Sequence, residues 1–115
     1  MKFLEYGELT ICLGIDRYKH SDNIGIVVYI VKYELRPLKR IEDVTMTVDF
    51  NDEKLEDGYA YVDTYRCPFA CDLIERFELG IPTGETKKRG GEVFPKYKFD
   101  IEKLKMYTPA SRNFL

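Results

Sequence analysis

Alternation of apolar and polar positions predicts that the first half of the chain consists mainly of strands. Every odd residue of 9–16 is apolar and every even one is not, the two-residue period of a strand with one face on a core. The turn-forming segment 20–23 leads into an apolar run over 24–31, which predicts a hairpin. Alternation resumes over 44–50, and a short strand over 59–63 is expected after a polar loop.

One helix is predicted after these strands. Cys67 would be its N-cap and Pro68 its first residue, where a missing N–H costs nothing, and Gly80 would follow its end in a left-handed conformation. Apolar side chains recur on one helical face at Phe69, Leu73, Ile74 and Phe77. The helix is therefore expected to lie across the sheet.

The chain after the helix is expected to add one strand. Residues 81–91 are predicted to be a loop, and 93–99 a strand that Pro95 restricts to a sheet edge or a bulge. A helical turn is expected from Asp100, and 107–115 is expected to be a loose tail. We therefore predict a single α+β domain over residues 1–106. It would have a largely antiparallel five-stranded sheet, one main helix in the order β-β-β-β-α-β, and a short C-terminal helical turn.

Composition and charge describe a globular protein without a strong overall field. Of the 115 residues, 44% are hydrophobic and 33% charged, enough for one core without metal or disulfides. The 18 basic and 20 acidic side chains leave a net charge of −2, so a phosphate backbone would be held only locally. The run 24–31 is too short to span a membrane, and the first residues lack a signal-peptide core. We expect a cytoplasmic protein without membrane contact.

The cysteines and the single histidine are the candidates for reactive or metal-binding chemistry. Cys67 and Cys71 would share one helix flank, and the helix dipole at Cys67 could lower its thiol pKa. A structural thiol is favoured, because His20, in a hairpin turn, is the only histidine available as a base. A zinc site would have to combine these residues with Cys12, which faces away from the predicted core, and no close Cys-x-x-Cys pair occurs. Phosphate-loop and dinucleotide fingerprints are also missing. We predict no metal, no cofactor and no catalytic residue.

Two segments are candidates for partner contacts, and each has a plainer structural explanation. Three consecutive cations lie between glycines in 83–91, which could hold phosphate or an acidic protein, or simply be solvated. Tyrosines on one face of 59–63 suit an interface, although cross-strand packing is the favoured explanation. The acidic run 49–57 could imitate phosphates, but such runs are usually solvated. The candidate partner-binding residues are Tyr59, Tyr61, Asp63, Thr83, Gly84, Lys87, Lys88 and Arg89.

The second half of the chain resembles a family. The resemblance is carried by Tyr61-Val62-Asp63-Thr64, Cys67-Pro68, Gly80-Ile81-Pro82-Thr83-Gly84, Gly90-Gly91 and Phe94-Pro95-Lys96-Tyr97-Lys98-Phe99-Asp100. In this order they resemble a small uncharacterised bacterial family, a domain of unknown function common on phages, plasmids and conjugative elements. The resemblance implies a mobile-element setting and carries no defined activity.

That setting leads to one functional hypothesis and two alternatives. Small proteins of mobile elements often bind host proteins, so we expect a non-enzymatic accessory factor. It could be an anti-defence inhibitor of the anti-CRISPR or anti-restriction type, occluding a host nuclease or CRISPR effector. The first alternative is a local nucleic-acid-binding module that uses 87–89, Lys96 and Lys98, with Tyr97 as stacking platform. The second is a thiol-dependent enzyme centred on Cys67. Either way, the oligomeric state stays open.

Overall fold

The computed structural model describes residues 2–32, 39–50 and 52–109. The strands are β1 (Leu4–Tyr6), β2 (Leu9–Arg17), β3 (Ile24–Lys32), β4 (Lys39–Thr45), β5 (Thr47–Val48), β6 (Tyr59–Val62), β7 (Gly80–Arg89) and β8 (Glu92–Phe99). The helices are α1 (Ala70–Arg76) and α2 (Ile101–Met106). No helix in this part of the chain is long and apolar enough to cross a membrane.

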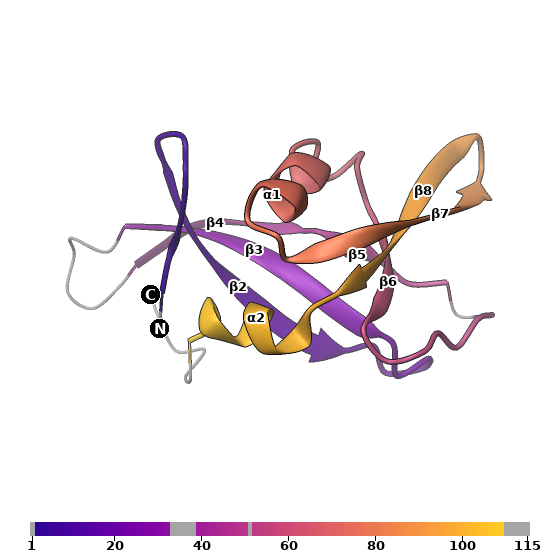
Figure 1. Ribbon diagram of the computed structural model, residues 1–115. Helices are drawn as coiled ribbons and strands as arrows, with labels where there is room; N and C mark the ends of the chain where they lie inside the picture. Colours follow the sequence, from indigo (N-terminus) through magenta and orange to yellow (C-terminus); the bar gives the residue numbers. More distant parts are fainter. Residues whose placement is uncertain (1, 33–38, 51, 110–115) are drawn as a thin grey trace.

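The strands form two antiparallel sheets rather than the predicted single five-stranded one. The first has the order β1-β2-β3-β4 and the second β5-β6-β8-β7 (Figure 1). The predicted strand 44–50 is divided between them, because Thr45 pairs with Val27 on β3 whereas Thr47 pairs with Val62 on β6. The alternation of apolar and polar residues continues through Met46, where the chain passes from the first sheet to the second, so the sequence pattern cannot reveal this change of sheet. The α+β class is confirmed, and the single sheet is wrong.

The segment predicted to be a loop, 81–91, is mostly strand β7. It pairs with β8 across a tight turn at Gly90 and Gly91, whose φ angles of 55° and 87° suit glycine. The register is irregular between Pro82 and Thr86. Glycine and consecutive cations indicated a loop locally, and pairing with a neighbouring strand overrode that signal. β8 itself lies between β6 and β7, so Pro95 is on an interior strand beside the irregularity and not at an edge.

The predicted helix exists, but both of its ends were wrong. α1 begins at Ala70, with Phe69 as N-cap, so Cys67 lies in the preceding turn. At the other end Glu78, with φ 54°, takes the left-handed position. Gly80 instead begins β7, where a Cβ would lie 2.9 Å from the carbonyl oxygen of Lys98. Close approach of two backbones, and not helix capping, explains this glycine.

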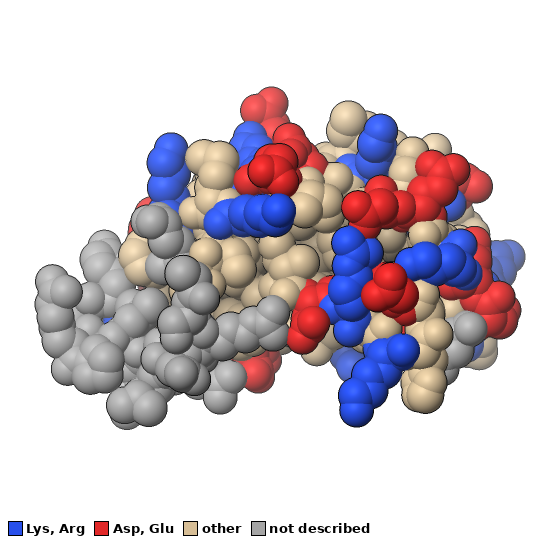
Figure 2. All heavy atoms as spheres, turned by 90° about the horizontal axis from the view of Figure 1, so that it is seen from below, with Lys and Arg blue, Asp and Glu red and all other residues tan. Residues whose placement is uncertain are grey.

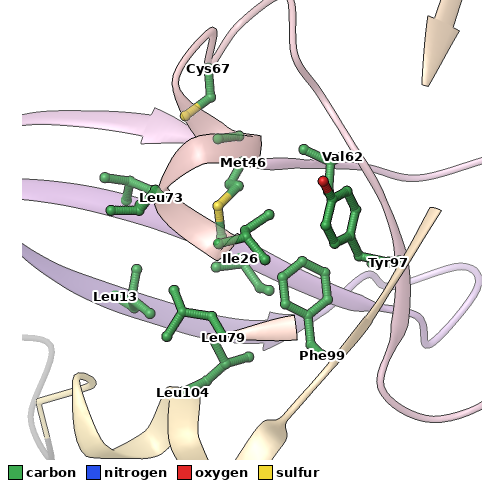
Figure 3. Close-up of a cluster of buried hydrophobic side chains, with 14 of the residues drawn as sticks. Leu13, Ile26, Met46, Val62, Cys67, Leu73, Leu79, Tyr97, Phe99 and Leu104 are labelled. Atoms are coloured by element: carbon green, nitrogen blue, oxygen red, sulfur yellow. The ribbon is translucent and has the colours of Figure 1, made fainter. Parts of the chain in front are cut away.

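The main core lies between the two sheets and the helices (Figure 3). Apolar burial of this kind supplies most of the driving force of folding. The fully buried side chains of the main core include Leu13, Ile26, Met46, Val62, Leu73, Leu79 and Leu104. A smaller cluster of Phe50, Leu55, Tyr61 and Phe94 forms a second hydrophobic centre. The second sheet therefore has apolar packing on both faces.

The C-terminal part joins the fold through α2. Its N-cap, Asp100, accepts the N–H of Lys103 at 3.1 Å, so the helical turn expected there is confirmed. The carbonyl oxygen of Tyr107 accepts the N–H of Leu13 at 2.8 Å. Of the predicted tail 107–115, residues 110–115 lie outside the described residues.

Candidate functional site

The aromatic strand predicted as a contact face is largely used for packing. Tyr61 is buried, lies edge-on to Phe50 with ring centroids 5.2 Å apart, and donates its hydroxyl to Glu53 at 3.2 Å. Burial, followed by the nearby Glu53, raises the pKa of Tyr61. Tyr59 is half-buried, with the Lys96 ammonium 5.2 Å from its ring centroid. Only Tyr59 of this pair keeps appreciable surface.

Asp63, the third residue predicted on that face, orders a turn. It is buried, and its Oδ1 accepts the N–H groups of Tyr65 at 3.2 Å and Arg66 at 3.0 Å. An aspartate that bonds N–H groups two and three residues ahead stabilises a turn. Asp63 therefore holds the connection from β6 to α1.

The basic and acidic segments predicted as separate surfaces bind each other. The Lys87 ammonium lies 3.1 Å from Asp52 and 3.0 Å from Glu53, and 4.8 Å from the centroid of the Phe50 ring. The hydrogen bond that Lys87 donates to Glu53 is the main reason why the pKa of Lys87 is raised. The hydrogen bond from Lys87 in turn lowers the pKa of Asp52. Figure 2 shows acidic and basic side chains intermixed on one face of the molecule.

The other predicted residues of β7 point in different directions. The Thr83 hydroxyl donates to the carbonyl of Lys96 at 3.0 Å, and Gly84 has φ 86° within the irregular stretch. The Arg89 guanidinium lies 4.9 Å from the centroid of Phe50. Lys88 is exposed. Arg89 therefore meets Lys87 at the Phe50 ring, whereas Thr83 and Lys88 do not join them there.

The structure also places the residues that the two alternative functions would use. Tyr97, proposed as a stacking platform, is buried and donates its hydroxyl to Glu75 at 3.0 Å, so a base cannot stack on it. Cys67 is buried, and this burial raises the pKa of its thiol to about 11. That is opposite to the shift that activates a nucleophilic cysteine. His20 is exposed, and no cluster of metal-binding side chains occurs within residues 2–32, 39–50 and 52–109.

A groove that none of the predicted partner-binding residues lines is the strongest candidate site. Its volume is about 520 Å³, within the range of roughly 300–1,000 Å³ that ligand sites have. Its lining residues belong to the end of α1 and the residues after it, the first residues of β7, and the end of β8 with the residue that follows. Figure 1 shows where these three elements lie. The lining residues of the groove are Glu75, Glu78, Gly80, Ile81, Pro82, Lys98, Phe99 and Asp100.

Ile81 is an exposed apolar side chain of the groove. It keeps 69% of its surface accessible, next to Pro82 and the ring of Phe99. The sequence contained one available signal, an isoleucine and a proline after a glycine, which we assigned to a loop and not to a surface.

Comparison with known proteins gives a family and no described activity. A search of the curated proteins and a search of the solved structures each found no match. A family profile matches residues 12–115, which is most of the chain and includes both helices, the second sheet and the first sheet without β1 and the first residues of β2. The chain therefore belongs to the family described as "Domain of unknown function (DUF4313)".

Proposed function

We propose that this protein is a non-enzymatic protein-binding module whose partner contacts centre on the groove around Ile81. The observation that carries the proposal is the 69% exposure of Ile81 beside Pro82 and Phe99. Covering such a side chain removes apolar surface from water, which favours association. Occlusion of a partner needs no catalytic group, and a few buried anchors can supply most of the binding energy.

The finer form of the proposal concerns the setting. The protein would act in the cytoplasm as an accessory factor of a mobile element, an anti-defence inhibitor that covers a surface of a host nuclease or CRISPR effector. The support for this part is the resemblance to a family common on phages, plasmids and conjugative elements. A small domain suits this role, because an interface of standard size occupies about 800 Å² on each partner.

A capture experiment with paired variants tests the proposal. The tagged chain is incubated with host lysate, and retained proteins are identified by mass spectrometry. Ile81→Asp should abolish retention of the partner, whereas Met106→Asp, which changes an exposed apolar side chain outside the groove, should not. Thermal unfolding confirms that both variants fold. Equal retention by all three proteins would contradict the proposed surface.

Nucleic-acid binding is the second candidate, favoured by Lys88 and Arg89, which are exposed near the turn between β7 and β8. If it operates, reversing both charges should reduce the slope of log affinity against log salt by about two, because each phosphate contact contributes about 0.9. Ile81→Asp should leave that slope unchanged. A wild-type chain that retains no DNA or RNA at low salt would exclude this candidate.

A further inference from the structure

Three carboxylates surround the groove, and Lys98 is the one cation among its lining residues in the described part of the chain. Glu75 is held by the hydroxyl of Tyr97 at 3.0 Å, and Asp100 by the first turn of α2. No residue that the structure describes bonds the Glu78 carboxylate. The rim thus has an excess of negative charge and one carboxylate that is free to pair.

The floor of the groove is apolar and closely fitted. Phe99, Ile81 and Pro82 supply its apolar surface. At Gly80 the backbones of β7 and β8 approach so closely that a Cβ would lie 2.9 Å from the carbonyl oxygen of Lys98. A partner side chain would therefore meet apolar surface below and carboxylates around it.

The strand that borders the groove accepts only a short addition. β7 is an edge strand of its sheet, the position at which an extended segment can add. Beyond Ile81, however, Pro82 has no N–H to donate, the register is irregular up to Thr86, and cations occupy 87–89. Proline, irregular register and charge all oppose strand addition at an edge. A long added strand, including a second copy of β7, is therefore disfavoured.

We infer that the groove takes a short extended segment of a partner protein in which an apolar side chain lies next to a lysine or arginine, an inference that rests on the proposed function. The apolar side chain would cover Ile81 beside Pro82, and the cation would pair with Glu78. An acidic segment or a phosphate backbone would meet three carboxylates and be repelled. This combination selects a partner by both attraction and repulsion.

Two synthetic peptides test the charge preference. Both are fluorescein-labelled six-residue peptides of alternating threonine and valine with a central isoleucine, preceded by arginine in one and by glutamate in the other. Fluorescence anisotropy with the full chain should give about tenfold tighter binding of the arginine peptide. Amide chemical shifts should change at Gly80, Ile81 and Lys98, and raising the salt concentration should reduce the difference between the peptides.

Variants of one carboxylate separate charge from folding. Glu78→Lys should weaken binding of the arginine peptide about fivefold and strengthen that of the glutamate peptide. Glu78→Gly also removes the carboxylate, at a position whose φ of 54° favours glycine, and should weaken arginine-peptide binding without loss of stability. Glu8→Lys, an equal charge change at an exposed turn outside the groove, should leave binding unchanged.

The outcomes distinguish this inference from the proposed function. Equal binding of both peptides, no binding of either at millimolar concentration, or shift changes confined to other residues would each overturn the inference. In all three cases the capture experiment with Ile81→Asp still decides separately whether the groove binds a protein. Selective binding that Glu78→Lys reverses would establish the inferred recognition.

Discussion

Met46 donates its backbone N–H to the carbonyl of Ile26 on β3 at 2.9 Å, while its own carbonyl accepts the N–H of Asp63 at 2.8 Å. Met46, where the chain passes from one sheet to the other, is thus hydrogen-bonded to the first sheet and to the residue that follows β6 in the second. Its side chain is fully buried in the main core (Figure 3). The position therefore links the two sheets through both backbone and side chain.

Shortening that side chain should destabilise the whole domain. Met46→Ala leaves a cavity at the junction and should lower the free energy of unfolding by about 3 kcal/mol, whereas Met46→Leu keeps the volume and should cost less than about 1.5 kcal/mol. Urea unfolding followed by circular dichroism measures both values. Similar costs for the two variants would show that the site tolerates a void.

Replacing Glu78 by glycine should stabilise the protein. Its φ of 54° is a conformation that costs an L-residue with a Cβ about 1 kcal/mol relative to glycine. Glu78→Gly should raise the free energy of unfolding by about 0.5–1 kcal/mol, after the added entropy of the unfolded chain. Lys103→Gly, in α2, should instead lower it by about 1 kcal/mol. A free energy of unfolding that is lower for Glu78→Gly than for the wild type would contradict the backbone strain inferred at Glu78.

The ion pairs of Lys87 with Asp52 and Glu53 should contribute to the free energy of unfolding over a defined pH range. The pKa of Lys87 is raised above 10.5, so its contribution is complete below that value and disappears as the pH rises through the folded-state pKa. The pKa of Asp52 is lowered below 3.8, so its contribution is present above that value and disappears as the pH falls. Lys87→Met should therefore lower the urea midpoint near neutral pH and have less effect at both extremes. High salt should also reduce the effect, because the pair is partly exposed.

The buried thiols should react only after unfolding. Burial raises the pKa of both Cys12 and Cys67 from 9.0 to about 11, whereas Cys71 is partly exposed. At pH 8, iodoacetamide should modify Cys71 first, and the other two only in urea, as peptide mass spectrometry can show. Because the unfolded chain loses these protons at lower pH than the folded one, stability should also fall between about pH 9 and 11. Rapid native labelling of Cys67 would contradict its burial.

The order of apolar and polar residues along the chain predicted those strands and the helix that belong to a single sheet or helix over their whole length. Residues 9–15 became part of β2, as their two-residue alternation predicted, and residues 24–31 became part of β3, as the apolar run after a turn predicted. The helix was found from Leu73 and Ile74, although each of its ends was misplaced by two residues, at Cys67 and at Gly80. Capping depends on backbone geometry that neighbouring elements can override.

The groove was missed because its residues come from two separate stretches of the sequence, 75–82 and 98–100. Glu78, Ile81 and Phe99 become neighbours only when α1 ends beside the first residues of β7 and the end of β8. The contact between the basic and the acidic segment was missed for the same reason, since Lys87 pairs with Asp52 and Glu53, more than 30 positions earlier in the chain. The groove and the ion pairs of Lys87 both join residues that are far apart in the sequence. A run of like charges considered by itself suggests an open surface, although here the basic and acidic residues pair with each other.

Taken alone, the sequence determined the α+β class, most of the strands, the main helix and the family, because hydrophobic period and turn residues act over a few neighbours. Only the tertiary structure decided that two sheets form, that 80–89 is a strand, and where the groove lies. The physical reason is that strand pairing and apolar burial are made between distant segments. Met46 changes sheets because Thr45 and Thr47 find different partners, a choice that no local pattern contains.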